Sequence, residues 1–302
     1  MGWYAAGRGD RVSVLPYGRR LAFTGTGERR CTGVRRGGRR TPCPTAAPVP
    51  AASGSAQCAE CARLDRSFSV AADTRAADPR PYRVYLAWFG PGLLKVGITA
   101  EERGTTRLLE QGAVAWSWLG RGPLMAARRT EELLRAALGV PDRIPYARKR
   151  AVRAQLPPAA EREREVARLH GLAAALPGRP DSLEPLPCAV VDHGGAFGLA
   201  ALGVPAESAT PAVSATPAEP AAGSGARPAQ VLAAMADGGT VAGLLVAAAG
   251  PDLHFADGLV VDARLLAGWA LTAAGPDAVT SGVPLAALPA PPPEPGRQDG
   301  LF

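Results

Sequence analysis

The chain has 302 residues, more than one hydrophobic core usually takes up, so we expect two or three domains joined by flexible segments. With 36 glycines, 30 prolines and only 5% aromatic residues, the composition excludes a single compact body, and much of the chain should be loop, linker or tail. The net charge of +7 suits a polyanionic partner such as nucleic acid, although a GC-rich coding sequence also raises the arginine content.

Neither a membrane span nor a signal peptide is evident in the sequence. The longest apolar stretch, residues 241–249, falls far short of the ~20 residues that cross a bilayer, and it contains a glycine. Residues 1–10 contain no hydrophobic run. We therefore expect a cytoplasmic protein without a membrane partner.

The first predicted unit, residues 1–77, is strongly basic and poor in large apolar residues. Arginines far outnumber acidic residues in it, and the glycines beside them favour turns. Such clusters are typical of phosphate contacts, and a solvated loop without a partner is the alternative. The arginines expected to bind nucleic acid here are Arg35, Arg36, Arg39 and Arg40.

Four of the five cysteines lie in this unit, within 31 residues: Cys31, Cys43, Cys58 and Cys61. In a reducing compartment, clustered cysteines are more often a metal site than disulfides. Cys58 and Cys61 form a C-x2-C pair suited to two corners of a zinc tetrahedron, whereas Cys31 and Cys43 are separated by eleven residues, unlike those of a regular zinc ribbon. We expect a structural zinc ion that folds this segment, and a redox-active or unliganded set is the alternative.

The second predicted unit, residues 78–176, begins at a proline-rich stretch. The pattern then predicts an antiparallel hairpin with strands at 82–89 and 93–99. Thr99 and Glu102 have the spacing of a capping box, so a helix is expected after the second strand.

Further helices and a third strand are predicted downstream in this unit. They are a helix at 107–111 that ends at Gly112, a strand at 114–119, and helices at 124–138 and 159–176. In the helix at 124–138, apolar residues three and four positions apart form one face, and Glu131 lies on it. Its neighbour Glu132 should point to solvent.

The rest of the chain divides by composition into four predicted parts. They are a β-rich segment at 177–204 with strands at 188–192 and 196–202, a disordered linker at 205–228, a small β-rich region at 229–286 and a disordered proline-rich tail at 287–302. His170, His193 and His254 form no ligand pair and should be structural or exposed. Cys188 is expected to be a small buried apolar residue.

The second unit resembles the GIY-YIG superfamily of nucleic-acid-processing domains between about residues 82 and 140. The resemblance rests on Val84-Tyr85, on Lys95-Val96-Gly97-Ile98-Thr99, on Arg107 and on Glu131. With the cysteine segment in front, the arrangement also resembles a bacterial family of unknown function near that superfamily. It implies an α+β fold: a small three-stranded antiparallel sheet with flanking helices, an N-terminal zinc-binding segment and a small C-terminal β-rich region.

The resemblance implies cleavage of phosphodiester bonds with one divalent ion, Mg²⁺ or Mn²⁺. Tyr85 would assist the attacking water, Arg107 would stabilise phosphate charge and Glu131 would bind the metal. Lys95 stands in the second motif where typical members have tyrosine. Arg103 is an alternative to Arg107 at a shorter spacing and is also expected to contact nucleic acid.

Each of these residues also has an ordinary structural interpretation. Tyr85 would then be a half-buried strand residue, Lys95 and Arg107 would be surface charges, and Glu131 would be the partner of a buried arginine. Two other functions therefore stay open: a catalytically inactive nucleic-acid-binding module and a structural adaptor.

The last five residues resemble the peptides by which bacterial DNA-processing proteins dock on the sliding clamp. The positions that carry the resemblance are Gln298, Leu301 and Phe302. An apolar pair on a flexible tether suits insertion into a pocket, which makes the clamp a candidate partner, and an idle tail is the alternative.

Overall fold

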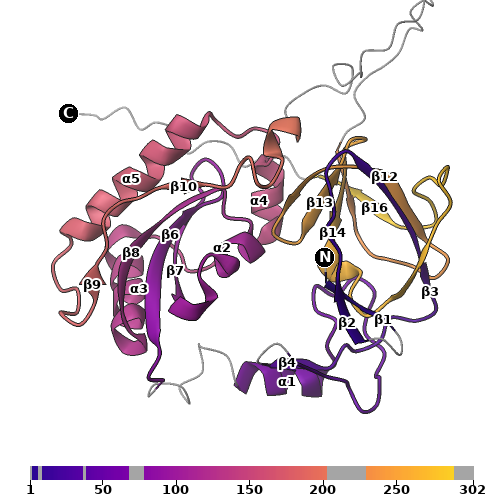
Figure 1. Ribbon diagram of the computed structural model, residues 1–302, viewed down its shortest axis with the longest axis horizontal. Helices are drawn as coiled ribbons and strands as arrows, with labels where there is room; N and C mark the ends of the chain where they lie inside the picture. Colours follow the sequence, from indigo (N-terminus) through magenta and orange to yellow (C-terminus); the bar gives the residue numbers. More distant parts are fainter. Residues whose placement is uncertain (1, 6–8, 37–38, 68–77, 203–228, 289–302) are drawn as a thin grey trace, which may run out of the picture.

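The computed structural model describes residues 2–5, 9–36, 39–67, 78–202 and 229–288. These residues form two lobes that lie side by side, each built on a β-sheet (Figure 1). The predicted linker at 205–228 and the clamp-like residues Gln298, Leu301 and Phe302 lie outside the described residues. The α+β class is confirmed, and none of the helices described is long and apolar enough to cross a membrane.

Between residues 82 and 138, the strands and helices of the first lobe occur in the predicted order. Its strands are β6 (Pro81–Trp88), β7 (Leu94–Ala100), β8 (Ala115–Pro123), β9 (Glu184–Pro185) and β10 (Val191–Asp192). Its helices are α2 (Thr106–Gln111), α3 (Leu124–Leu138), α4 (Tyr146–Val152) and α5 (Ala159–Ala175).

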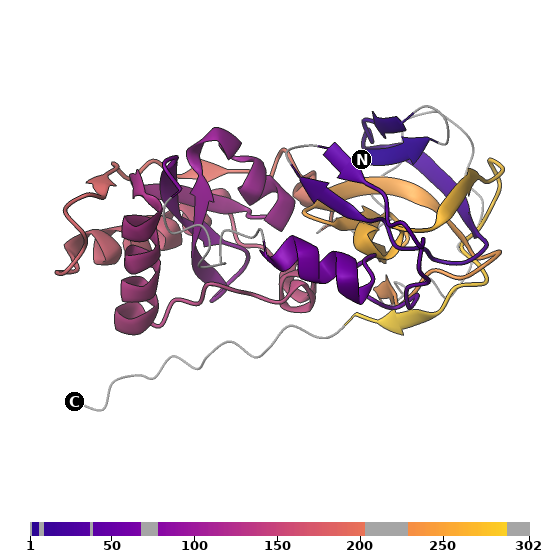
Figure 2. The same ribbon diagram turned by 90° about the horizontal axis from the view of Figure 1, so that it is seen from below.

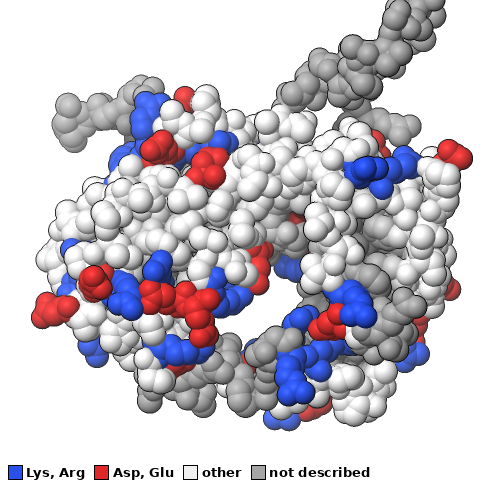
Figure 3. Space-filling model, in the orientation of Figure 1, with Lys and Arg blue, Asp and Glu red and all other residues white. Residues whose placement is uncertain are grey.

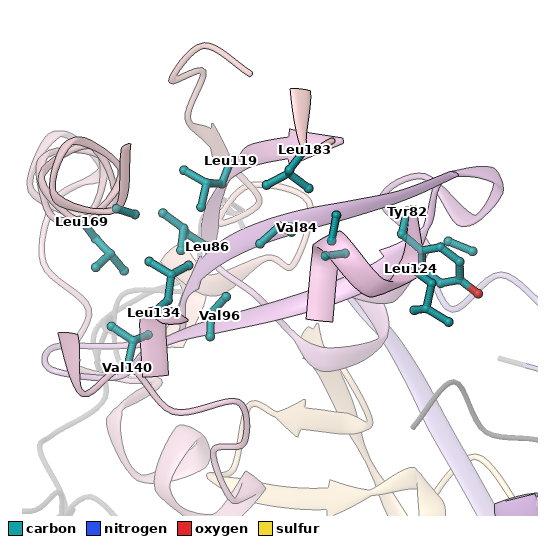
Figure 4. Close-up of a cluster of buried hydrophobic side chains, with 14 residues drawn as sticks. Tyr82, Val84, Leu86, Val96, Leu119, Leu124, Leu134, Val140, Leu169 and Leu183 are labelled. Carbon is teal, nitrogen blue, oxygen red and sulfur yellow. The ribbon is translucent and has the colours of Figure 1, made fainter. Parts of the chain in front are cut away.

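The sheet of the first lobe has the order β10-β8-β6-β7, and β9 also pairs with β8. All of these pairs are antiparallel. Central strand β6 is covered on both faces, which explains why its sequence lacks apolar alternation. Val84 and Leu86 pack against α3 and α5 on one face (Figure 4), whereas Tyr85 and Ala87 face the other way.

The second lobe is a seven-stranded sheet in the order β15-β3-β12-β13-β14-β11-β16. Only the pair β11–β14 is parallel among the described strands of this sheet. Its strands are β3 (Arg19–Thr26), β11 (Gln230–Leu232), β12 (Thr240–Ala249), β13 (Asp252–Phe255), β14 (Leu259–Asp262), β15 (Ala270–Ala273) and β16 (Leu285–Ala287).

The N-terminal unit is not self-contained, because strand β3 lies between β12 and β15. Leu21 and Phe23 of β3 pack against the core of the second lobe, so residues predicted as part of unit 1–77 complete the sheet of region 229–286. Two short hairpins and one helix make up the rest of this segment: β1 (Gly2–Ala5) with β2 (Gly9–Val12), β4 (Val34–Arg36) with β5 (Arg39–Thr41), and α1 (Ala59–Ser67). In Figure 1, α1 lies below the gap between the two lobes, and in Figure 2, seen from below, it crosses the middle of the molecule.

The two lobes share buried contacts where α2 and β8 meet β12. Trp88 and Ala115 of the first lobe belong to the same apolar cluster as Ala247 and Ala249 of the second. Helix α4 adds a buried ion pair, in which Arg150 contacts Asp252 at 2.5 Å. The lobes are therefore packed against each other, with both apolar and ionic contacts across the junction.

Three local predictions are wrong. Thr99 lies in β7 and does not cap a helix: the short 3-10 helix Glu101–Arg103 that follows has no side-chain cap. Residues 199–202 form a 3-10 helix and not a strand, because Gly198 turns the chain with a φ of +68°. Cys188 is exposed, since it lies outside the paired residues of β9 and β10 at the sheet edge.

Candidate functional site

The four cysteines predicted as metal ligands lie together beside α1. Their sulfur atoms are all within 4.8 Å of one another, and Cys43 and Cys58 are 4.0 Å apart. Four thiolates around one zinc ion at about 2.3 Å would place neighbouring sulfurs about 3.8 Å apart. The cluster can therefore hold a structural metal ion such as zinc.

Backbone geometry holds this cluster in place. The amides of Cys58 and Gly33 donate hydrogen bonds to Cys31 Sγ, at 3.2 and 3.4 Å. Gly33 has a φ of +77°, and a side chain there would overlap the backbone of residues 41–43. Only glycine lets the two segments approach closely enough to bring Cys31 and Cys43 together.

The thiols differ in how readily they lose a proton. Hydrogen bonds from the Thr45 side chain and the Ala47 backbone lower the pKa of Cys43 to about 6. Burial and the neighbouring thiols raise the pKa of Cys61. A bound cation would stabilise these sulfurs as thiolates, because its positive charge offsets the repulsion between them. Four thiolates are the donor set of a closed zinc site.

The predicted basic residues of the first unit lie on the hairpin next to the cysteines. Arg35 pairs with Asp10 at 3.2 Å, and Arg40 Nε donates to the carbonyl of Thr32 at 2.9 Å. Arg39 is exposed, and the side chain of Arg36 is outside the described part. This hairpin therefore carries exposed positive charge while remaining tied to the cysteine segment.

Arg29 is a structural residue that the sequence did not distinguish from its basic neighbours. It is only 1% exposed, and its guanidinium donates to five backbone carbonyls. Two of these acceptors, Ala267 and Arg264, belong to the second lobe, and the other three are in residues 50–53. Arg29 thus joins the cysteine segment to the second lobe.

A second group of predicted site residues gathers on the sheet of the first lobe. Tyr85 of β6 is 1% exposed, and its hydroxyl accepts a 2.9 Å hydrogen bond from Gln111 Nε2 of α2. Burial raises the pKa of Tyr85, although the bond from Gln111 and the charge of Arg107 oppose the rise. The hydroxyl is therefore held neutral and oriented at neutral pH.

Lys95 of β7 is buried and not a surface lysine. Its ammonium donates to the carbonyl of Asp142 at 2.8 Å and lies 5.7 Å from the centroid of the Tyr85 ring. Burial and the charge of Arg107 lower the pKa of Lys95 to about 8. An amine of this kind changes protonation close to neutral pH.

Arg107 and Arg103 differ in their position relative to this group. Arg103 is held by two hydrogen bonds to the carboxylate of Glu110, at 2.8 and 2.9 Å. Arg107 approaches Glu110 only to 3.9 Å, and its charge acts on both Tyr85 and Lys95. Arg107 is therefore the arginine that faces Tyr85.

Glu131 of α3 is partly buried, and it forms no hydrogen bond or ion pair within the described residues. Burial raises the pKa of Glu131, and the nearby charge of Asp142 raises it further. Its neighbour Glu132 is exposed and pairs with Arg135 at 2.6 Å. Of these two neighbouring glutamates, Glu131 is therefore the one whose carboxylate has no ion pair among the described residues.

Lys149 of α4 is a further buried cation, which the sequence pattern did not indicate. Its ammonium lies 3.7 Å from the centroid of the Phe89 ring and donates to the carbonyl of Gln111 at 3.1 Å. Burial and the charge of Lys95 lower the pKa of Lys149 to about 7. Gln111 therefore links Lys149 to Tyr85. Both the burial of Lys149 and this link depend on contacts between residues far apart in the sequence.

Comparisons with known proteins give one finding. Neither the curated proteins nor the solved structures contain a match to this chain. The model of a family described as "Protein of unknown function (DUF2797)" matches residues 18–271, a span that includes β3, the cysteine cluster and most of both lobes. The chain therefore belongs to the DUF2797 family.

Proposed function

We propose that this protein binds nucleic acid and cleaves phosphodiester bonds at a GIY-YIG-like site. The observation that carries the proposal is that the Lys95 ammonium of β7 lies 5.7 Å from the ring centroid of Tyr85 in β6. The charges of Arg107 in α2 and Glu131 in α3 act on both of these residues. An exposed guanidinium can stabilise phosphate charge, a partly buried carboxylate can bind a metal ion and a phenol held in place can position water, so the three groups suit phosphoryl transfer.

Each residue has a role that follows from its contacts. Arg107 binds the phosphate oxygens, because its guanidinium is exposed and only loosely paired with Glu110. Tyr85 orients water through its hydroxyl, whose position is fixed by Gln111. Lys95, with a pKa of about 8, can accept a proton near neutral pH.

Glu131 would hold a divalent cation, Mg²⁺ or Mn²⁺, which when bound supplies Lewis-acid charge to the phosphate. A partly buried carboxylate with a raised pKa and no ion pair in the described part of the chain suits this role. Hard oxygen donors, one or two of them carboxylates, are what Mg²⁺ prefers. The zinc ion proposed at the four cysteines would instead be structural.

The test is cleavage of labelled DNA and RNA substrates, single-stranded, double-stranded and branched, in the presence of Mg²⁺ or Mn²⁺. We expect cleavage by the wild type, a loss of at least about 100-fold in Glu131→Gln and near-normal cleavage in the matched control Glu132→Gln. Equal cleavage by both variants would refute the role of Glu131.

A second candidate is a nucleic-acid-binding module without catalysis. It is favoured by the 1% exposure of Tyr85 and by the bond that engages the Lys95 ammonium. This function predicts no cleavage under any condition, together with salt-dependent binding that Glu131→Gln leaves unchanged.

A further inference from the structure

A pocket lies between the two lobes. Residues 143–147 and Arg150 form one wall, and Asp262 and Arg264 of the second lobe form the other. Its volume of about 490 Å³ is in the range of sites that bind small organic ligands. Figure 3 shows charged side chains around an opening between the lobes.

The single acidic residue in the pocket wall is already paired. Arg264 donates hydrogen bonds to both oxygens of Asp262, at 2.9 and 2.5 Å. Arg150 forms an ion pair with the same carboxylate at 3.1 Å. Arg150 is also tied to Asp252 behind the wall. The pocket therefore presents a surplus of positive charge, because three arginines face one neutralised carboxylate.

Two of these arginines keep donors for a ligand. Arg264 uses Nε and Nη2 on Asp262, which leaves its Nη1 donors without a partner in the described structure. Its guanidinium stacks on the ring of Tyr146, 4.2 Å from the centroid, so its orientation is fixed. Arg143, on the opposite wall, is exposed and makes no hydrogen bond or ion pair with any described residue.

We propose that this pocket binds a phosphate monoester of about nucleotide size. Two guanidinium groups on facing walls match a dianionic phosphate, which has more acceptor sites than a carboxylate. Ile144, Pro145 and Ala147 supply an apolar surface for the organic part of the ligand. None of these pocket residues has a role in the proposed cleavage, so binding can be tested without it, and the pocket adjoins that site because the charge of Arg143 acts on Lys95.

The test is calorimetric titration of the full chain with inorganic phosphate and with a nucleoside 5′-monophosphate. We expect Arg143→Ala to weaken binding by about tenfold or more, because a charge-assisted hydrogen bond is lost. Arg148→Ala is the matched control, because Arg148 is exposed on α4 and does not line the pocket. Equal thermal unfolding of both variants will show that the fold is intact, as expected for two exposed side chains.

The source of the phosphate is distinguished by titrating 5′-phosphorylated and 5′-hydroxyl oligonucleotides beside the mononucleotide. Tighter binding of the phosphorylated strand end, lost in Arg143→Ala, would identify a nucleic-acid terminus, and tighter binding of the mononucleotide would identify a small phosphate ester. Absence of wild-type binding at millimolar concentration, or equal binding by Arg143→Ala and Arg148→Ala, would overturn the proposal.

Discussion

Tyr85 and Gly97 face each other across the β6–β7 hairpin, and the phenol of Tyr85 lies over the α-carbon of Gly97. They are register partners in the sheet, and a β-carbon at position 97 would overlap the hydroxyl and ring of Tyr85. Glycine at this position therefore makes room for a tyrosine whose hydroxyl reaches Gln111.

Gly97→Ala should displace the Tyr85 ring and destabilise the fold by about 1–3 kcal/mol, as overpacking of a core does. It should also reduce cleavage or binding at the proposed site more than its effect on stability explains. Urea unfolding and the cleavage assay measure the two effects. Gly171→Ala is the control, because open space surrounds this helical glycine and alanine there should be neutral or slightly stabilising. Unchanged stability of Gly97→Ala would contradict the packing described.

The cysteine cluster should bind about one zinc ion per chain, as four thiolates form one closed site. Cys58→Ser should lose most of that zinc and unfold residues around α1, which have little core of their own. Elemental analysis and thermal unfolding with and without a chelator provide the measurement. Cys188→Ser should behave as the wild type, because Cys188 is exposed and far from the cluster in sequence. Zinc retained in full by Cys58→Ser would argue against a four-cysteine site.

The ion pairs of Arg150 should stabilise the junction between the lobes. Arg150→Met leaves Asp252 buried at 1% exposure without its closest partner, which should cost about 3–5 kcal/mol at neutral pH. Burial already raises the pKa of Asp252, and loss of Arg150 should raise it further. An unpaired buried carboxylate destabilises the fold less once it is protonated. The loss of stability in Arg150→Met should therefore become smaller as the pH falls. Denaturant unfolding of Arg150→Met and Arg148→Met at several pH values tests this, and a defect equal in both variants would contradict it.

The buried ammonium of Lys149 should destabilise the fold most at low pH. Its pKa of about 7 lies below that of an unfolded lysine, so stability should rise as the pH increases from about 7 to about 10.4. Lys149→Met removes this dependence and should therefore gain stability relative to the wild type as the pH falls through that window. Unfolding of both proteins at pH values across the window provides the comparison. A difference in the free energy of unfolding that stays constant across the window would show that protonation of Lys149 does not destabilise the fold.

Local patterns in the sequence predicted much of the first lobe. The helix at 124–138 was predicted with its observed bounds because its apolar residues recur every three to four positions. Gly112 was recognised as a helix stop, and it adopts the left-handed conformation with a φ of +68°. The clustering of the four cysteines in the sequence predicts that they lie together, and the structure brings their sulfur atoms within 4.8 Å of one another.

Long-range contacts could not be predicted in this way. Strand β3 pairs with β12, more than 200 residues later in the chain. Neither strand has a local sequence pattern that identifies its pairing partner. Arg29 and Lys149 lie in basic stretches that favour solvent exposure, yet each is buried because distant carbonyls or a ring surround it. The sequence marks Gln111 only as the last residue of a helix, because its bond to Tyr85 depends on how α2 packs on β6.

The central claim is that Arg107 and Glu131 act together in one site that cleaves phosphodiester bonds. The decisive measurement is the single-turnover cleavage rate of the wild type, Arg107→Ala, Glu131→Gln and the double variant, on the best substrate of the panel. We predict a large loss in each single variant and little further loss in the double variant, because residues that act as a unit are strongly non-additive. Cleavage that persists at the wild-type rate in both single variants would contradict the proposed site.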